Sequence, residues 1–320
     1  MGGRASPTRA SVGVQASHPR RDRGSRRRAR ASINSASIIS ARVTAPAIIT
    51  LTTDFGVRDS YVAEMKAVIL RMTRAVHLVD VTHEVEPQQV AEAAFAVEGA
   101  TRFFPAGTIH LAVVDPGVGT ERRGLVVVSA GQLFVGPDNG LFTPILARGD
   151  WDAYELAAPE YRLPSVSRTF HGRDVFAPAA AHLALGVEPA RFGPAVADPV
   201  RLPWPEARVV AGGVAGTVIH VDRFGNLVTS IEAGQVRALA TESAIHGTVR
   251  IGARALPLVG TYADLPRGAA GALVGSRNRL EVVVRDGNAA SALRARRGTP
   301  VVLSRTTLVS RGRRPRRGSE

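Results

Sequence analysis

The chain has 320 residues, of which 45% are hydrophobic, so it is long enough for two packed domains and too apolar to be disordered throughout. It contains no cysteine, which excludes disulfides, thiolate metal sites and cysteine nucleophiles. The formal net charge of +14 lies mostly at the two ends: residues 1–45 hold ten arginines and one aspartate, and residues 306–320 hold five arginines and one glutamate. The part between them is close to neutral.

The basic segment 1–45 is expected to be a disordered, low-complexity leader, although a transit peptide or residues upstream of the true start would look similar. Residues 306–320 are expected to form a second basic tail. Arginine runs without interleaved aromatic residues offer phosphate contacts and little else, so we expect no nucleic-acid partner beyond nonspecific contacts. No apolar run approaches the ~20 residues of a membrane span, and we expect a cytoplasmic protein without a membrane partner.

Residues 46–200 alternate between short β-branched runs and helical patterns, which predicts an α/β domain with a mostly parallel sheet covered by helices. Asp59 or Ser60 is the expected N-cap of the first helix, Pro87 opens the second, and Gly186 closes the third. The expected strands are 48–53, 76–81, 108–114, 125–129 and 133–135, and the expected helices are 61–72, 88–103 and 174–185.

The composition changes around Trp204, which is flanked by two prolines, and the long helical patterns end there. We expect a linker over 201–212. Beyond it, residues 213–305 read as short strands separated by Gly, Asn and Pro. This pattern predicts a smaller antiparallel domain, a barrel or a sandwich. Its clearest strands are expected at 217–221, 248–251, 280–284 and 300–303.

Two acidic residues follow predicted strands of the first domain, where an open parallel sheet binds its ligands. Asp54 comes after strand 48–53 and is placed to accept both hydrogens of a ribose diol, or else to cap a turn. Asp115 comes after strand 108–114 and precedes a Gly/Pro loop that leads to Arg122. A tight loop would return Arg122 to Asp115, whereas a plain surface turn would leave an exposed ion pair of little energetic value.

His171 precedes the third predicted helix, and helix N-termini attract anions and present free N–H groups. A capping or surface histidine would occupy the same position. His77, His83, His110 and His182 show no metal-ligand spacing, so we interpret them as structural and expect no metal site.

Polar residues also cluster at turns of the second domain. Asp222, Phe224 and Asn226 lie within five residues, a set suited to the ammonium and carboxylate of an amino acid or simply to a hairpin turn. Ser276-Arg277 and Gly287–Ser291 surround a predicted strand. The small residues after Gly287 would let a planar base approach the backbone, or would merely start a short helix.

In this order the segments TTDFG (52–56), VDPGVGTERR (114–123), TFHGRD (169–174), DRFGN (222–226) and GNAAS (287–291) resemble the S-adenosylmethionine hydroxide adenosyltransferase family, relatives of the bacterial fluorinase and chlorinase. The resemblance covers about residues 47–305. It implies a Rossmann-like first domain, a β-barrel second domain and a homotrimer with active sites between subunits. It also implies an enzyme that hydrolyses its substrate, S-adenosylmethionine, to adenosine and methionine without a cofactor.

The resemblance assigns roles residue by residue. Asp54 matches the ribose-binding acid, and Asp115, Arg122 and His171 match the set that activates water for attack on ribose C5′.

In the second domain, Asp222 and Asn226 match positions that hold the methionine moiety. The other substrate-pocket positions are Phe224, Ser276, Arg277 and Ala289, with Ala289 near the adenine and Ser276 and Arg277 near the methionine end.

Three departures from the halogenases favour water as the nucleophile. Asp115 stands where the fluorinase has a tyrosine, Gly172 stands where it has a fluoride-binding serine, and its long insertion is missing between Arg123 and Phe134. The alternatives are a halide-using transferase on the same fold and a sensor that binds S-adenosylmethionine or adenosine without turnover.

Two accounts of water activation remain open at this point. Asp115 can accept the proton of the water, but an arginine beside it favours the charged carboxylate and weakens it as a base. Alternatively, Arg122 and His171 stabilise the developing hydroxide directly.

Overall fold

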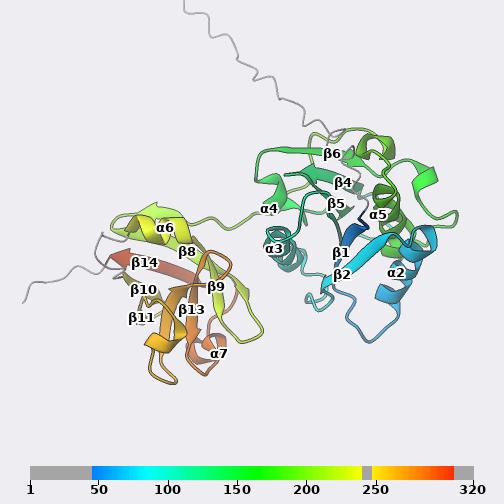
Figure 1. Ribbon diagram of the computed structural model, residues 1–320. Helices are drawn as coiled ribbons and strands as arrows, with labels where there is room; N and C mark the ends of the chain where they lie inside the picture. The colour runs from blue at the N-terminus through cyan, green and yellow to red at the C-terminus, as the bar shows by residue number, and fades with distance from the viewer. Residues whose placement is uncertain (1–44, 240–246, 306–320) are drawn as a thin grey trace, which may run out of the picture. The chain divides into compact units, whose positions relative to one another are not determined.

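The computed structural model describes residues 45–239 and 247–305 (Figure 1). Apart from Ala45, the basic segments expected at 1–45 and 306–320 lie outside the described residues. The described chain forms an α/β part followed by a part made almost entirely of antiparallel strands, as expected.

The α/β part is built on a six-stranded sheet with the order β2-β1-β3-β5-β4-β6. Strands β2, β1, β3 and β5 run parallel, while β4 is antiparallel to both of its neighbours, so the expectation of a mostly parallel sheet is confirmed. The strands are β1 (Ala47–Thr53), β2 (Val76–Thr82), β3 (Ile109–Val113), β4 (Gly124–Ser129), β5 (Gln132–Pro137) and β6 (Trp151–Glu155).

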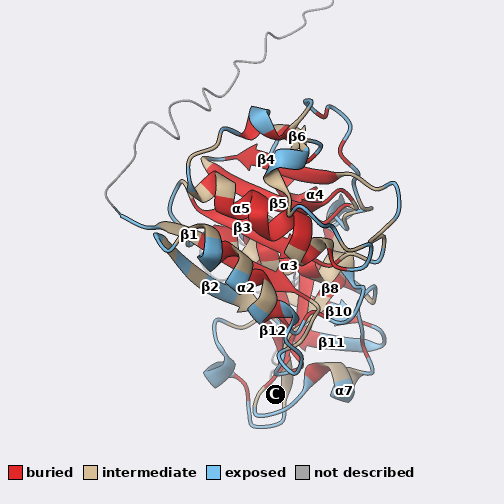
Figure 2. Cartoon of the chain, turned by 90° about the vertical axis from the view of Figure 1, so that its right-hand side faces the viewer, coloured by how far each residue is buried: buried red, intermediate tan, exposed pale blue. Residues whose placement is uncertain are grey.

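Helices cover both faces of this sheet, which is why β3, β4 and β5 are buried along their whole length (Figure 2). Helices α2 (Tyr61–Met72) and α5 (Ala177–Ala184) pack into one apolar cluster with alternate residues of β3, and α3 (Val90–Thr101) and α4 (Thr143–Leu146) contribute to a second cluster. β2 stands at the sheet edge and keeps several exposed residues.

The helix boundaries refine the sequence prediction at two places. Helix α2 has the expected bounds, but α3 begins at Val90, because Gln88 has a φ of +66° and does not continue a helix. The third helix is preceded by one π-helical turn, η2 (Gly172–Phe176), so the helical backbone begins directly after His171. Two 3₁₀ turns, η1 (Pro159–Tyr161) and η3 (Pro189–Phe192), complete this part.

The second part is an antiparallel sheet with the order β11-β10-β14-β8-β9-β13-β12, with β7 paired to β8. Leu258, just after β11, bridges to Ala272 on β12, and this contact between the two ends of the sheet nearly closes it into a barrel. The expected barrel is thereby confirmed. Its strands are β7 (Arg208–Val210), β8 (Gly213–Val221), β9 (Leu227–Glu232), β10 (Gly247–Ile251), β11 (Arg254–Pro257), β12 (Ala270–Val274), β13 (Arg279–Val284) and β14 (Pro300–Arg305).

Short helices fill the connections of the barrel: α6 (Ala233–Leu239), η4 (Tyr262–Asp264) and α7 (Ala289–Leu293). Asn288 caps α7, because its Oδ1 accepts the backbone N–H of Ser291 at 2.8 Å. The segment 201–212, expected as a linker, contains β7. None of the helices within 45–239 and 247–305 combines the length and the apolar character needed to cross a bilayer.

Candidate active site

Asp54 and Asp115 lie at the same edge of the α/β sheet. Asp54 follows β1 directly, Asp115 follows β3 by two residues, and the two strands are parallel neighbours, so their carboxyl ends meet. Asp54 Oδ2 accepts the backbone N–H of Gln88 at 2.8 Å. One oxygen of this carboxylate is therefore held by the backbone, and the other is not engaged by any hydrogen bond among the described residues.

The loop after Asp115 returns Arg122 to its carboxylate. Gly119 makes this path possible, because it has a φ of +79° and a Cβ at this position would collide with the carbonyl oxygen of Arg168. Arg122 Nε lies 2.9 Å from Asp115 Oδ1 and 3.0 Å from Oδ2, and Nη2 also donates to Oδ2. The Asp115 and Arg122 side chains are only 5% and 11% exposed, so this is not the exposed ion pair of a surface turn.

His171 completes the cluster at the start of η2. Its Nδ1 lies 2.7 Å from Arg122 Nη2. A guanidinium only donates, so Nδ1 must accept and the ring proton sits on Nε2. Burial, followed by the charge of Arg122, lowers the pKa of His171 below its ordinary value of 6.5. His171 is thus neutral at pH 7, with an N–H available as a donor.

Asp54, Asp115 and His171 all line one cavity of about 420 Å³. Three aromatic rings form one wall: Tyr61 and Phe55 lie 5.2 Å and 5.8 Å from the centroid of Phe170. The cavity combines an apolar wall, a ring N–H and two carboxylates. It is therefore suited to a cationic or sugar-like ligand and to a small nucleophile beside Asp115.

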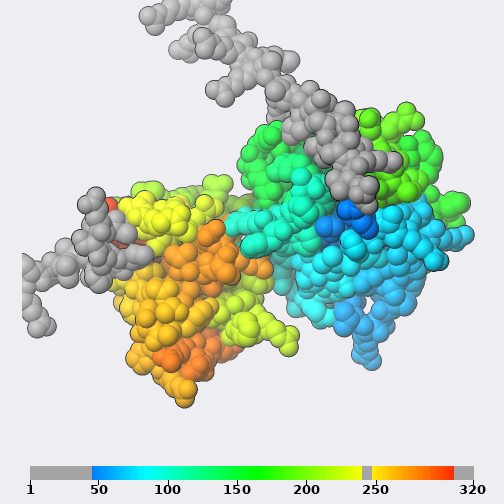
Figure 3. Space-filling view, in the orientation of Figure 1, coloured from blue at the N-terminus to red at the C-terminus, as the bar shows by residue number. Residues whose placement is uncertain are grey.

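Five of the six predicted residues of the second part, all except Ala289, line another cavity, of about 460 Å³, on the barrel. Asp222 organises the β8–β9 turn, because its Oδ1 accepts the backbone N–H of Phe224 at 2.9 Å and of Asn226 at 2.8 Å. Asn226 Nδ2 donates to Asp222 Oδ2 at 2.9 Å. Phe224 is 75% exposed on this turn, which projects in lime from the barrel in Figure 3.

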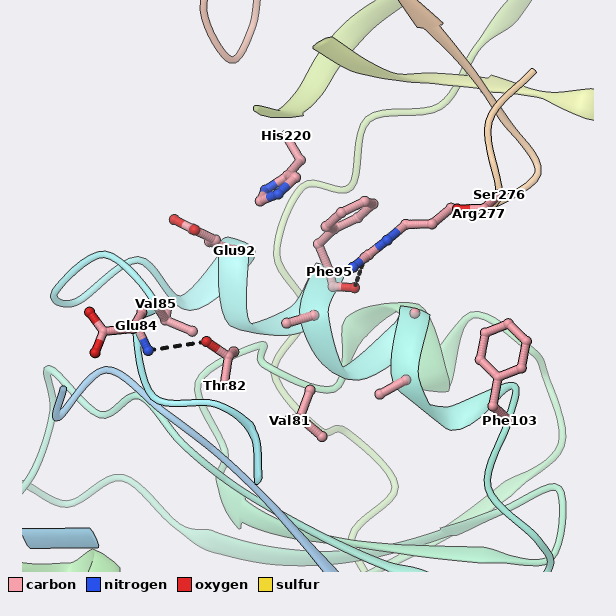
Figure 4. A pocket seen from close by; sticks show the side chains of 13 residues that line it. Val81, Thr82, Glu84, Val85, Glu92, Phe95, Phe103, His220, Ser276 and Arg277 are labelled. Atoms are coloured by element: carbon pink, nitrogen blue, oxygen red, sulfur yellow. Dashed lines mark hydrogen bonds between the residues drawn. The ribbon is translucent and has the colours of Figure 1, made fainter. Parts of the chain in front are cut away.

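Ser276 and Arg277 lie in the β12–β13 turn and border the same barrel cavity. The Arg277 guanidinium lies 4.4 Å from the centre of the Phe95 ring, and its Nη1 donates to the Phe95 carbonyl oxygen at 3.3 Å (Figure 4). The stacked ring and the hydrogen bond hold the extended arginine in one direction.

Ala289 is fully buried at the start of α7 and packs into the barrel core, so it lines neither of the two cavities. The next residue, Ala290, donates its N–H to Gly225 O at 2.9 Å. The N-terminus of α7 thus lies against the turn that carries Asp222 and Asn226. The expected proximity of Ala289 to the adenine stays a prediction.

Two residues that line these cavities could not be identified from the sequence. Gln88 contacts Asp54 through its backbone N–H, so no side-chain pattern in the sequence marks it. A non-glycine residue at positive φ beside this carboxylate is visible only in the structure. Glu281 lines the barrel cavity but reads in the sequence as one polar residue within a strand.

Two buried histidines of the described residues, His83 and His110, have structural partners. His83 Nδ1 and His110 Nδ1 lie 2.8 Å from the hydroxyls of Thr53 and Thr50, and burial lowers the pKa of His110 to about 4. Within residues 45–239 and 247–305, no three His, Asp or Glu side chains gather as a metal ion would require.

Comparison with protein families finds two matching domain models. Residues 49–193 match the SAM hydroxide adenosyltransferase N-terminal domain, and residues 216–302 match the SAM hydroxide adenosyltransferase C-terminal domain. Together these regions contain every residue assigned to the two cavities.

The similar curated proteins include S-adenosylmethionine hydrolases and fluorinases. A protein named (R)-S-adenosyl-L-methionine hydrolase from Thermus thermophilus is 41% identical over 78% of this chain and 96% of its own length. One with the same name from Salinispora tropica is 39% identical, over 77% and 93%. A fluorinase from Nocardia brasiliensis is 31% identical, over 73% and 88%.

Two solved structures share the fold. An uncharacterized conserved protein from Thermotoga maritima is 34% identical with a TM-score of 0.76, covering 80% of this chain and all of that one. A conserved hypothetical protein from Thermus thermophilus is 40% identical with a TM-score of 0.66, covering 80% and 99%.

Proposed function

Since the chain belongs to the SAM hydroxide adenosyltransferase family, we propose that it hydrolyses S-adenosylmethionine to adenosine and methionine by attack of water on ribose C5′. The observation that carries the proposal is the buried cluster of Asp115, Arg122 and His171 beside Asp54. These four residues supply what the reaction needs, a ribose contact and a polar environment for one water molecule.

The reaction makes modest demands on the enzyme. The water oxygen forms a bond to C5′, the C5′–S bond breaks with its electron pair going to sulfur, and the water loses one proton. A sulfonium leaves as a neutral thioether, so no acid has to protonate the leaving group. The protein must align the water behind C5′ and stabilise the charge that develops on its oxygen.

Within the cluster, Asp115 is the proton acceptor that we favour. The Nδ1 lone pair of His171 is occupied by Arg122, and its Nε2 carries a proton, so the neutral ring donates to the water and does not act as a base. Asp115 keeps lone pairs beyond those facing Arg122. Arg122 orients the carboxylate and lends positive charge to the site, which makes it the second contributor.

The remaining residues would hold the substrate. Asp54, oriented by Gln88, would bind the ribose diol, and Ala289 would lie near the adenine. The methionine end would be bound in the barrel cavity, with Glu281 as a carboxylate for its ammonium group beside the predicted Asp222, Asn226, Ser276, Arg277 and Phe224. The 75% exposure of Phe224 supports a turn that a second copy covers, as in the expected homotrimer with sites between subunits. Cytoplasmic location and the lack of any cofactor are parts of the same proposal.

The name of the relatives specifies the (R) configuration at the sulfonium. We therefore extend the proposal to a preference for the (R) epimer over the (S) epimer. Attack on C5′ is directed along the C5′–S bond, and the epimers differ only in how methyl and methionine groups are placed around sulfur.

Halide transfer is the second candidate, because fluorinases are also similar to this chain. The residue at position 172 argues against it: a Cβ there would stand 3.3 Å from both Met65 Sδ and the Phe170 ring. Gly172 offers no hydroxyl to a halide, and the tight surroundings leave little room for one.

The test is incubation with each epimer of S-adenosylmethionine, followed by chromatography for adenosine and methionine in equal amounts, with and without excess chloride or fluoride. The proposal predicts equimolar products, with faster release from the (R) epimer and no halogenated nucleoside. A halogenated nucleoside would support the transferase, and binding without any product would support a sensor; either result contradicts hydrolysis.

A further inference from the structure

The carboxyl end of β5 lies between the two ends of the Asp115 loop, residues 114–123. In the sheet β5 stands between β3 and β4. β3 runs parallel to β5 and ends just before the loop, whereas β4 is antiparallel to β5 and begins just after it. The loop therefore connects its two strands across the end of β5. The residues that follow β5, Asp138 and Asn139, are placed to contact both ends of the loop.

The loop itself has little internal structure. Its backbone hydrogen bonds connect near neighbours only: the Val118 N–H donates to the Asp115 carbonyl oxygen at 3.2 Å, and the Thr120 N–H donates to the Gly117 carbonyl oxygen at 3.2 Å. Glycines at 117 and 119 give the backbone further freedom. The relative position of the Asp115 and Arg122 side chains therefore depends on contacts that hold the loop from outside.

Asn139 holds the first end of the loop. Its Nδ2 donates to the Val114 carbonyl oxygen at 2.8 Å, and its Oδ1 accepts the Leu141 N–H at 3.2 Å. Val114 is fully buried and lies one residue beyond β3, so its carbonyl group needs a donor from outside the strand. This carbonyl group belongs to the peptide bond between Val114 and Asp115. The hydrogen bond from Asn139 thus fixes the peptide plane from which the Asp115 side chain starts.

Asp138 holds the second end through Arg123. Arg123 Nε and Nη2 lie 2.9 Å and 2.7 Å from Asp138 Oδ2, and the Asp138 N–H donates to the Arg123 carbonyl oxygen at 2.9 Å. Asp138 Oδ1 accepts the Val200 N–H at 2.7 Å, and the Asp138 side chain is only 2% exposed. Buried charge-assisted hydrogen bonds of this kind are strong and directional. They fix the residue that directly follows Arg122.

Arg123 also has a second acidic partner, which provides a comparison. Arg123 Nη1 lies 3.0 Å from Asp198 Oδ1, but the Asp198 side chain is 82% exposed. Exposed ion pairs contribute little, because solvent screens the charges. The constraint on Arg123 therefore comes from Asp138.

We propose that Asp138 and Asn139 are positioning residues for Asp115 and Arg122, an inference that rests on the function proposed above. Neither residue lines the cavity that contains Asp54, Asp115 and His171, so they act through the loop and not on the substrate. By fixing the backbone on both sides of the loop, they hold the carboxylate and the guanidinium in one geometry before substrate binds. A preorganised site needs no rearrangement during the reaction, which raises its rate.

The variants Asn139→Ala and Asp138→Asn each release one end of the loop. We expect each variant to lower kcat on the order of 10- to 100-fold and to change KM by less than about threefold, because Asp54, the predicted ribose contact, lies outside the loop. Asn139 is only half-buried, so Asn139→Ala keeps the test decisive if Asp138→Asn does not fold. A kcat within about threefold of the wild type in Asn139→Ala overturns the proposal.

Each variant has a matched control. Gln132 lies at the other end of β5, where its Nε2 donates to the Phe104 carbonyl oxygen at 2.8 Å. Gln132→Ala removes the same kind of amide-to-carbonyl hydrogen bond far from the loop, so it should lower the melting temperature and leave kcat unchanged. Asp198→Asn removes only the exposed partner of Arg123 and should behave as the wild type. A loss of kcat in Gln132→Ala equal to that in Asn139→Ala would show a general effect of stability and overturns the proposal.

A double-mutant cycle separates positioning from a purely structural role. If Asn139 acts through Asp115, Asn139→Ala should lower kcat by no more than about threefold in the Asp115→Asn protein, where the carboxylate to be positioned is already absent. The same fold-loss of kcat in both backgrounds would show that Asn139 acts independently of Asp115, which contradicts the proposal.

Hydrogen exchange followed by mass spectrometry tests the positioning role without turnover. In the full chain, peptides that cover residues 114–123 should exchange faster in Asn139→Ala and Asp138→Asn than in the wild type, and at the wild-type rate in both controls. Unchanged exchange of these peptides overturns the positioning role even if the wild type releases adenosine. Faster exchange supports it even if no adenosine forms, so this proposal and the proposed hydrolysis fail independently.

Discussion

The molecule holds its functional acids in two different ways. In the α/β part, the carboxylate of Asp115 accepts hydrogen bonds from Arg122, and Arg122 also donates to His171. The charges of this closed cluster are therefore balanced within the chain. Glu281, on the barrel, is as well buried but has no donor among the described residues. We therefore propose that the first site is organised before substrate arrives, whereas the second is completed by the ammonium group of the substrate.

The two sites should therefore respond differently to mutation. Removing one member of the closed cluster leaves the others unpaired in a buried place and disturbs the reacting centre. Removing Glu281 takes away only what the substrate would contact. In kinetic terms, the closed cluster should control kcat and the open site should control KM.

The largest effect is expected from breaking the closed cluster. Asp115→Asn keeps the shape of the side chain and removes the base, so kcat should fall on the order of 10²- to 10⁴-fold with little change in KM. His171→Ala should cost less. Asp198→Asn is a matched control, because Asp198 also pairs with an arginine, Arg123, but is exposed. Saturation kinetics of the variants provide the measurement.

The same series of variants shows which side chain contributes most to kcat. If Arg122→Ala lowers kcat more than Asp115→Asn does, stabilisation of hydroxide by the cation outweighs proton transfer to Asp115. Turnover close to that of the wild type in all of these variants would contradict the cluster's role altogether.

A second effect should appear in KM. Asp54→Ala removes the predicted ribose contact, which is present in ground state and transition state alike, so KM should rise on the order of 10- to 100-fold while kcat changes far less. Steady-state kinetics measure both quantities. An unchanged KM would show that Asp54 does not bind the ribose, and the hydrogen bond from the Gln88 N–H to Asp54 would then have no role in substrate binding.

The Asp115 loop offers a test of preorganisation. Gly119 and Gly107 both have positive φ, +79° and +82°, but only Gly119 would bring a Cβ against a backbone carbonyl. Gly107→Ala should lower the free energy of unfolding by about 1 kcal/mol and leave kcat unchanged. Gly119→Ala should destabilise more and lower kcat by about tenfold, because Arg122 moves relative to Asp115.

Chemical denaturation and saturation kinetics on both alanine variants give the two quantities. Equal loss of stability and equal kcat in the two variants would show that the close approach at Arg168 has no influence on the cluster.

The two sites should also separate in their pH dependence. In the proposed mechanism His171 works in its neutral form, and burial lowers its pKa below 6.5. The value of kcat should therefore stay level at neutral pH and fall only below pH 6.5, as the ring gains a proton. The pKa of Glu281 is raised by burial, so KM should increase as pH falls towards that pKa, because the acid must be charged to bind an ammonium.

Profiles of kcat and KM between pH 4.5 and 8 test this separation. His171→Gln should remove the acid limb of kcat alone, and Glu281→Gln should flatten the acid limb of KM alone. An acid limb of kcat that persists in His171→Gln would assign the titration to another group.

Much of the fold could be predicted because its signals are local. The strand ends before Asp54 and Asp115 follow from apolar runs, and helix α2 follows from its periodicity. Strand β6 was missed, because its sequence Trp-Asp-Ala-Tyr-Glu mixes polar residues into an edge strand that is only half-buried.

The site residues that the sequence did not reveal depend on nonlocal geometry. Gln88 contributes a backbone N–H in a left-handed conformation, which no propensity predicts for glutamine. The role of Glu281 depends on which face of β13 it occupies and on the empty place at Gly275, neither of which spacing encodes.

The most direct test of the central claim is one turnover experiment in water enriched in heavy oxygen. If water attacks ribose C5′, mass spectrometry must find the heavy oxygen in the 5′-hydroxyl of the adenosine, in proportion to the enrichment of the solvent, and none in the methionine. Adenosine without the label, or labelled methionine, would contradict attack of water at C5′.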